Sequence, residues 1–182
     1  MQRPLTRRSL LTGFAMAATG AACVAAATGE ARAGEVQIEK FSEAGKSLGV
    51  ESLPKVVKSD AEWRKQLTPL SYQVTRHEGT EPRAFSDHEH PDGLYRCICC
   101  ATALYDSRTK FESGTGWPSF YQPISKLNIV QTNDSSFGMQ RIAVSCRRCD
   151  AHLGHVFDDG PKPTGLRYCM NRVAMQFVPR KA

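Results

Sequence analysis

One cysteine stands apart from the other thiols and has polar neighbours suited to chemistry. Cys169 lies in the stretch GLRYCMN, residues 165–171, beside Arg167 and Asn171. The thiolate is the nucleophilic form of cysteine, and a nearby positive charge lowers the pKa of the thiol. On an extended segment the Arg167 side chain would project to the same face as Cys169. This pattern favours a reactive thiol, against the alternative of a small buried hydrophobic residue.

Two histidines lie shortly before this cysteine. His152 and His155 belong to the stretch HLGHVFDDG, residues 152–160. Imidazole titrates closest to neutral pH, so two histidines near a nucleophile could deliver a proton to a leaving oxygen. The alternative is that each histidine is a hydrogen-bonded structural residue, but their clustering with Cys169 favours catalysis.

Four further cysteines form two pairs of equal spacing, Cys97-x-x-Cys100 and Cys146-x-x-Cys149. Two such pairs supply the four thiolates of a closed tetrahedral zinc site. Because the pairs are far apart in the sequence, a shared metal would close a long loop and constrain the unfolded chain. In an oxidising compartment each pair could instead form a disulfide. Cys99 would point away from its neighbours on a strand, which predicts a packed thiol rather than a ligand.

Residues 59–179 resemble the B-type peptide-methionine (R)-sulfoxide reductases, the MsrB or SelR family. Three signatures carry the resemblance, FESGTGWPSF at 111–120, HLGHVF at 152–157 and TGLRYCMN at 164–171. The resemblance implies a mostly β fold, β-tent-like, in which two antiparallel sheets roll around the active-site groove. It also implies one structural Zn²⁺ per chain, held by Cys97, Cys100, Cys146 and Cys149.

The resemblance assigns chemistry to individual residues. It implies that Cys169 attacks the sulfur of a methionine sulfoxide of R configuration, releases methionine and retains a sulfenic acid. His152 and His155 would act as acids and hydrogen-bond donors, and Trp117 would support the ε-methyl group of the substrate. Three polar residues would orient water and imidazole, namely Asp159, Arg167 and Asn171. The partners implied are oxidised proteins that carry methionine-R-sulfoxide.

One position departs from the family pattern. Many members have a resolving cysteine where this chain has Thr115, and threonine cannot form the disulfide. Once the N-terminal segment that contains Cys23 and the four proposed ligands are set aside, Cys99 is the remaining unassigned thiol. It lies beside two proposed metal ligands, and a disulfide needs Cα atoms within about 7 Å. We therefore expect a thioredoxin-like dithiol or a small thiol to reduce Cys169 directly.

The N-terminus is typical of an export signal. Arg7 and Arg8 precede an apolar, alanine-rich run at 13–27 and a small-x-small site at 31–33. The run is short for a membrane span, and the paired arginines indicate the twin-arginine route. Residues 1–33 are therefore predicted to be a twin-arginine signal peptide, against the alternative of a cytoplasmic protein with an alanine-rich tail.

This route carries folded proteins, so zinc could be bound before export to the periplasm. There the enzyme would repair oxidised proteins of the cell envelope. Cys23 lacks the leucine expected three residues before a lipidated cysteine. We expect no stable membrane insertion after signal removal.

Charge and length narrow the class of protein. Removing residues 1–33 takes away four arginines and one glutamate, so the formal charge falls from +6 to about +3. Without a basic stripe interleaved with aromatic residues, we expect no nucleic-acid partner. The remainder has the length of one ordinary domain, and we expect a monomer. We assign 34–57 to a linker or N-terminal extension along the domain surface and 58–182 to the reductase domain.

Local patterns predict two short helices followed by strands. Ser59 and Glu62 form a capping box that opens a helix to about Leu67. Thr68 as N-cap and Pro69 then start a second helix. In this helix Leu70 and Val74 are expected on one face, and Gly79 lies beyond its end. Strands are predicted at 94–98, 128–131 and 137–146, with alternation of Val173, Met175 and Phe177 in the last run. Glu112 and Asp134 are interpreted as solvated acids.

Two other classes of protein remain to be compared. A zinc-ribbon interaction module would explain four cysteines but would leave Cys169, the histidine pair and Trp117 without a task. A thiol-disulfide oxidoreductase would use one Cys-x-x-Cys pair directly and would have a thioredoxin-like βαβ pattern, which this sequence does not have.

Overall fold

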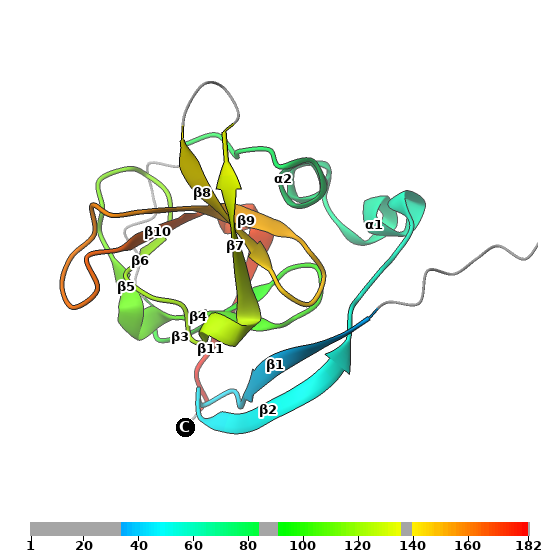
Figure 1. Ribbon diagram of the computed structural model, residues 1–182, viewed down its shortest axis with the longest axis horizontal. Coiled ribbons are helices and arrows are strands. Elements are labelled where there is room, and N and C mark those ends of the chain that lie inside the picture. Colours follow the sequence, from blue (N-terminus) through cyan, green and yellow to red (C-terminus); the bar gives the residue numbers. More distant parts are fainter. Residues whose placement is uncertain (1–33, 84–90, 136–139, 182) are drawn as a thin grey trace, which may run out of the picture. The chain divides into compact units, whose positions relative to one another are not determined.

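Antiparallel strands make up most of the regular structure in the computed structural model, which describes residues 34–83, 91–135 and 140–181. A six-stranded sheet has the order β5-β6-β10-β9-β8-β7, and a three-stranded sheet has the order β11-β3-β4 (Figure 1). The strands of the larger sheet are β5 (Lys110–Phe111), β6 (Ser119–Phe120), β7 (Ile129–Asp134), β8 (Arg141–Cys146), β9 (His152–Phe157) and β10 (Arg167–Met170). Those of the smaller are β3 (Gly93–Cys97), β4 (Ala103–Asp106) and β11 (Met175–Pro179). All pairings are antiparallel, which confirms the predicted mostly β class.

Three short 3-10 helices accompany these strands in the described residues. They are η1 (Ser107–Thr109), η2 (Lys126–Asn128) and η4 (Arg172–Ala174). None of the helices in the described residues is long and apolar enough to cross a membrane.

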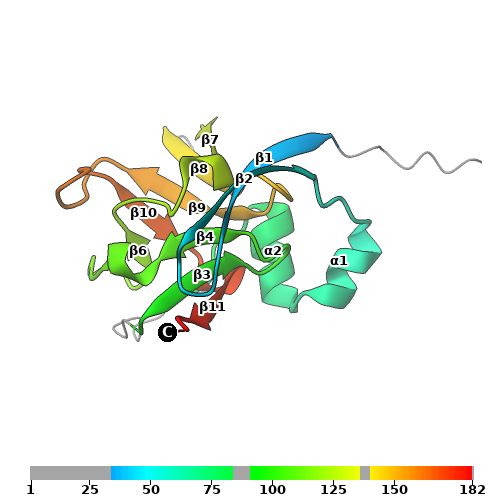
Figure 2. The ribbon, with the colours of Figure 1, turned by 90° about the horizontal axis from the view of Figure 1, so that it is seen from below.

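The two predicted helices are present, and both begin at the predicted residues. Helix α1 (Asp60–Gln66) has Ser59 and Glu62 in a complete capping box, and α2 (Pro69–His77) begins after the N-cap Thr68 (Figure 2). The expectation for Leu70 was wrong, since its side chain is 40% exposed while Val74 is fully buried. The apolar face of α2 is instead continued by Tyr72.

The segment assigned to a linker or N-terminal extension contains regular structure, which the sequence did not predict. Strands β1 (Glu35–Phe41) and β2 (Ser47–Pro54) pair as a hairpin. Asn128 binds this hairpin from a distant part of the chain, because its amide accepts the Glu39 N–H and donates to the Glu39 carbonyl, both at 2.9 Å. β2 is exposed along most of its length, so the local sequence lacks the apolar alternation that reveals a buried strand.

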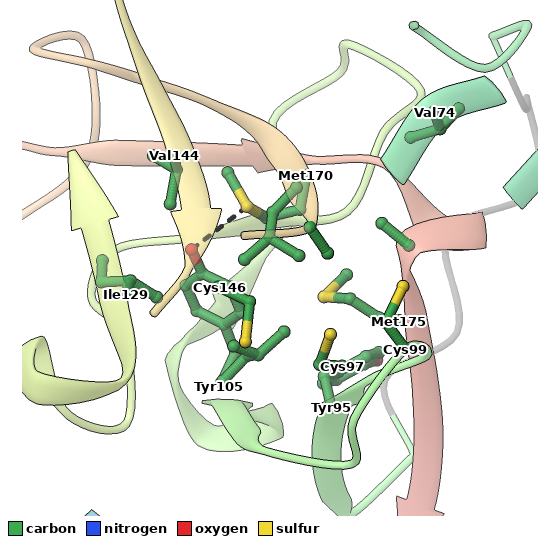
Figure 3. Packing of buried hydrophobic residues seen from close by; sticks show 14 of the residues in the cluster. Val74, Tyr95, Cys97, Cys99, Tyr105, Ile129, Val144, Cys146, Met170 and Met175 are labelled. Carbon is green, nitrogen blue, oxygen red and sulfur yellow. Dashed lines mark hydrogen bonds between the residues drawn. The ribbon is translucent and has the colours of Figure 1, made fainter. Parts of the chain in front are cut away.

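The core brings aromatic rings and sulfur atoms together. Tyr105 stacks on Phe120 with ring centroids 4.4 Å apart, and its hydroxyl donates to Met170 Sδ at 3.1 Å (Figure 3). Met170 is fully buried. Because side chains alternate along a strand, Met170 fixes the preceding residue, Cys169, toward the opposite face of β10.

β10 is the element that positions Cys169. The residue lies opposite His155 on β9 and opposite Ser119 on β6. Gly154 lets β9 approach this strand closely, because a Cβ there would lie 2.2 Å from the Cys169 carbonyl oxygen. A larger residue at this position would push β10 away and displace the thiol.

Candidate active site and four-cysteine cluster

The two spaced cysteine pairs meet in one cluster. The sulfur atoms of Cys97, Cys100, Cys146 and Cys149 all lie within 4.8 Å of one another. The Cys97–Cys149 and Cys100–Cys146 sulfur distances are 3.6 Å. Tetrahedral coordination with bonds of about 2.3 Å would place sulfurs about 3.8 Å apart, whereas a disulfide requires about 2.05 Å. The cluster therefore could hold a metal ion, as the spacing predicted.

Matched turns present the four thiols. Cys97 ends β3 and Cys146 ends β8. In each turn a residue with positive φ, Ala101 or Asp150, donates its N–H back to the first cysteine, at 2.8 and 2.9 Å respectively. Each turn therefore directs both of its thiols to the same point.

Titration of the thiols is consistent with a cation site. Hydrogen bonding between neighbouring sulfurs raises the pKa of Cys97 and lowers that of Cys100. Crowded thiols behave in this way because a second negative charge is unfavourable beside the first. A bound divalent cation would let all four ionise together.

Cys99 does not lie on a strand, so the argument from strand alternation was wrong. β3 ends at Cys97, and Cys99 lies in the turn that follows. Its side chain is 4% exposed and packs in the core, where Figure 3 shows it near Cys97. The interpretation as a packed thiol is compatible with this environment.

A cavity of about 180 Å³ opens beside Cys169. Its lining includes four of the predicted site residues, namely Trp117, His155, Cys169 and Asn171. The other lining residues are Thr80, Arg141, Gly154, Phe157 and Met170. Three predicted residues are not part of this lining, namely His152, Asp159 and Arg167.

The environment of Cys169 pulls the pKa of its thiol in two directions. Burial raises the pKa above its usual value, and it outweighs the lowering by Arg167, Thr115 and Ser119. The expected influence of Arg167 is therefore correct in sign, and burial, which acts in the opposite direction, is larger.

His155 has a fixed orientation in the cavity wall. Its Nε2 lies 2.8 Å from a carboxylate oxygen of Asp134, which also accepts from Arg141 at 2.7 Å. Asp134 and Arg141 are paired residues at the end of the β7–β8 hairpin. The carboxylate favours a proton on Nε2 and leaves Nδ1 as the other ring nitrogen. Asp134 is therefore not the solvated acid that was predicted.

His152 differs from His155 in protonation. It is 5% exposed, and its Nε2 has no hydrogen-bond partner among the described residues. Burial, followed by the nearby His155, lowers the pKa of His152 to about 4. His152 is consequently neutral near pH 7 and unsuited to donate a proton as an imidazolium, in contrast to the expectation from imidazole's ordinary pKa.

The segment at Glu81 supports two of the cavity residues. Trp117 donates its indole N–H to the Glu81 carbonyl at 3.3 Å, and Asn171 accepts the Glu81 N–H at 2.9 Å. The Asn171 amide also donates to the Leu153 carbonyl at 3.1 Å. These bonds hold the two sides of the cavity in position and commit the Asn171 amide to backbone partners.

Arg167 and Asp159 form a pair outside the cavity lining. Two guanidinium nitrogens of Arg167 donate to the two Asp159 carboxylate oxygens, both at 2.8 Å. The guanidinium also lies over the Phe157 ring, 4.4 Å from its centroid. Because Phe157 lines the cavity, this pair braces its wall from the outside.

Sequence reasoning missed several residues near Cys169. Arg141 and Thr80 line the cavity, and Asp134 binds His155. A signal existed for the contact between Asp134 and Arg141, since Asp134 lies between two predicted strands and the oppositely charged Arg141 lies in the second of them. Thr80 had no such signal, because it reaches the site from an irregular segment.

Known proteins are similar in sequence to this chain over the whole region that forms the cavity and the cluster. Residues 67–179 match the SelR domain family. A protein of Pseudomonas putida (strain F1), named peptide methionine sulfoxide reductase MsrB, is 54% identical over 131 residues, covering 70% of this chain and 99% of the relative. Proteins of the same name from Pseudomonas syringae pv. syringae (strain B728a) and Pseudomonas fluorescens (strain Pf-5) are each 53% identical over 131 residues, covering 70% of this chain and 99% and 100% of the relatives.

The fold, the thiol in its cavity and these similarities together define an oxidoreductase. More particularly, the chain belongs to the SelR or MsrB family of peptide methionine sulfoxide reductases.

Proposed function

We propose that this protein reduces the R epimer of methionine sulfoxide in oxidised proteins to methionine. The observation that carries the proposal is Cys169 in a cavity whose wall also contains Trp117 and His155. An apolar ring and a proton-handling group on the same cavity suit a substrate that has a methyl group and an oxygen on one sulfur. Membership of the MsrB family supports this substrate class.

Cys169 is the nucleophile in this proposal. Its thiolate attacks the sulfoxide sulfur, the sulfur–oxygen bond of the substrate breaks, and the oxygen remains on Cys169 as a sulfenic acid. A thiol and a sulfoxide thus become a sulfenic acid and a thioether, which balances atoms and electrons. In this proposal His155 acts as the imidazolium, with Nε2–H donating to Asp134 and Nδ1–H donating the hydrogen bond that assists the leaving oxygen.

The remaining predicted residues have supporting roles. Trp117 holds the ε-methyl group of the substrate, Asn171 holds the cavity wall through the Leu153 carbonyl, and the ring of His152 packs edge-to-face against the ring of His155. Arg167, fixed by Asp159, favours the Cys169 thiolate.

Zinc is the metal that best fits the cluster. Four cysteine sulfurs without an open position are the donor set of a structural zinc site. Cys97, Cys100, Cys146 and Cys149 would hold one Zn²⁺ per chain, and its contribution would be to folding, with no part in the redox step.

Regeneration of Cys169 is proposed to use an exogenous thiol. Thr115, at the position of the family's resolving cysteine, lies with its hydroxyl 4.0 Å from Cys169 Sγ. Cys99 lies in the core. A thioredoxin-like dithiol or a small thiol would therefore attack the sulfenic acid directly.

The assay that tests the function uses dabsylated methionine R- and S-sulfoxide with dithiothreitol as reductant. We expect reduction of the R epimer and at least about tenfold slower reduction of the S epimer, because the cavity fixes methyl and oxygen positions separately. Equal rates would overturn the epimer assignment, and no reduction of either would overturn the function. A zinc-ribbon module would reduce neither epimer, while a thiol-disulfide oxidoreductase would instead reduce a dithiol-accessible disulfide.

We also propose periplasmic location through the twin-arginine route, which rests on the sequence of residues 1–33 alone. These residues lie outside the described part of the structure. Arg7→Lys with Arg8→Lys should hold the precursor in the cytoplasm. Unchanged periplasmic yield, measured by fractionation, would contradict this route.

A further inference from the structure

Three hydroxyl groups form a continuous chain that reaches Cys169. Ser113 Oγ lies 2.8 Å from Thr115 Oγ1 and 2.8 Å from Ser119 Oγ. Thr115 Oγ1 is 4.0 Å from Cys169 Sγ, and Ser119 is the strand partner of Cys169. Ser113 is thus the link between two hydroxyls that both adjoin the thiol.

We propose that Ser113 is a positioning residue for Cys169, whose hydroxyl sets which of the Thr115 and Ser119 protons is presented to the thiolate. The proposal rests on the proposed role of Cys169 as the nucleophile and adds a residue that does not itself touch the thiol.

The number of protons in the chain supports this role. Each hydroxyl has a single proton, and Ser119 has a second acceptor, the Trp117 carbonyl, at 3.2 Å. When Ser113 donates to Thr115, the Thr115 proton is free to point to Cys169. When Ser113 donates to Ser119, the Ser119 proton becomes free for Cys169 or Trp117.

The same chain can reverse its direction. A neutral Cys169 thiol would donate a hydrogen bond to Thr115 Oγ1. The Thr115 hydroxyl would then turn its own proton toward Ser113 Oγ, which needs only rotation of the hydroxyls. In one arrangement Thr115 accepts a hydrogen bond from the thiol, and in the other it donates a hydrogen bond to the thiolate. The change between them needs no backbone movement. Hydroxyl rotors of this kind suit a sulfur that alternates between thiol, thiolate and sulfenic acid.

Burial of the site makes the chain effective. Ser119 is 1% exposed, and a buried thiolate gains more from a hydrogen bond than an exposed one. Burial raises the pKa of Cys169, whereas the Thr115 and Ser119 hydroxyls lower it. Loss of the link at Ser113 should therefore disfavour the thiolate while leaving the cavity lining unchanged.

The test measures alkylation of Cys169 by iodoacetamide as a function of pH, with the modified peptide quantified by mass spectrometry. Ser113→Ala should slow alkylation at pH 7 by about threefold to tenfold, less than the loss of a direct hydrogen bond to a charged group. The ratio to wild type should approach one at high pH, where the thiolate forms without help. This readout does not depend on sulfoxide reduction, so it can fail while the proposed function stands.

Two further variants and one control make the result decisive. Ser113→Thr retains the hydroxyl and should restore the wild-type rate within about twofold, while Thr115→Val keeps the volume and should slow alkylation at pH 7 at least as much as Ser113→Ala. Ser52→Ala, which removes an exposed hydroxyl bound to Glu35, is the matched control and should leave the rate unchanged. The proposal is wrong if Ser113→Ala or Thr115→Val alkylates at the wild-type rate at pH 7. It is equally wrong if the rate falls by the same factor at every pH, since that would indicate altered access.

Discussion

The four sulfurs of the cluster lie within 4.8 Å of one another and three of the four cysteines are buried, whereas Cys169 is half-buried beside an open cavity. The sulfur atoms of the cluster mainly contact one another. Cys169 Sγ meets hydroxyls, and a guanidinium and an imidazole lie nearby. A closed set of ligands stabilises a fold, and a single thiol with room beside it can react with a substrate.

The two regions also differ in how the chain builds them. Each Cys-x-x-Cys pair of the cluster comes from one local turn, and the two turns have the same type of backbone hydrogen bond. The cavity is lined by residues of β8, β9 and β10, by Trp117 just before β6 and by an irregular segment at Thr80. Damage to the cluster should therefore act on stability, and damage to the cavity should act on activity.

The largest expected effect is loss of a cluster cysteine. Cys146→Ser should lose zinc and lower the thermal unfolding midpoint by more than about 10 °C, because structural zinc contributes free energy comparable to the total stability of a domain. Cys99→Ser is the matched control, since Cys99 lies nearby without belonging to the cluster, and it should retain one zinc. Elemental analysis and thermal unfolding decide the matter, and wild-type protein without zinc would contradict the metal assignment.

Loss of the cavity thiol, Cys169, should affect activity rather than stability. Cys169→Ser should lower sulfoxide reduction to below about 1% of wild type, with the unfolding midpoint and the zinc content unchanged, because the nucleophile is lost but almost no volume. Activity with dithiothreitol is the measurement. Residual turnover above this level would mean that another thiol performs the chemistry.

His152 offers a pH test of how deeply the histidine behind His155 is buried. Its pKa in the folded protein is about 4, below the unfolded value near 6.5, so its stabilising contribution is present above pH 6.5. That contribution is lost as the pH falls toward 4 and amounts to at most about 3 kcal/mol. Urea unfolding between pH 7.5 and 4 should show a smaller loss of stability in His152→Gln than in wild type. Equal losses would show that His152 is not held in its neutral form.

A smaller effect is expected when the support of His155 is weakened. Asp134→Asn replaces a charged acceptor by a neutral amide and should lower kcat by about tenfold with little change in KM. Asp92→Asn, which alters an exposed carboxylate paired with Arg180, is the matched control. A wild-type kcat for Asp134→Asn would show that His155 needs no such orientation.

Local patterns were sufficient for the helices and for the cluster. The capping box at Ser59 and the Cys-x-x-Cys spacings depend on neighbouring residues, and both are confirmed. The N-terminal hairpin was missed because Asn128 holds it from 89 positions away. The burial that raises the pKa of the Cys169 thiol could not be predicted from the sequence, which shows only the charged neighbour Arg167.

The most direct test of the distinction between cluster and cavity identifies the cysteine that receives the oxygen of the sulfoxide. Wild-type protein is treated with one equivalent of methionine-R-sulfoxide, trapped with dimedone and digested for mass spectrometry. We predict one dimedone adduct per chain, at Cys169, with none on the four cluster cysteines, and the same result for Cys99→Ser. A Cys99–Cys169 disulfide in place of the adduct would contradict direct reduction by an external thiol, and an adduct at a cluster cysteine would contradict the assignment of Cys169 as the nucleophile.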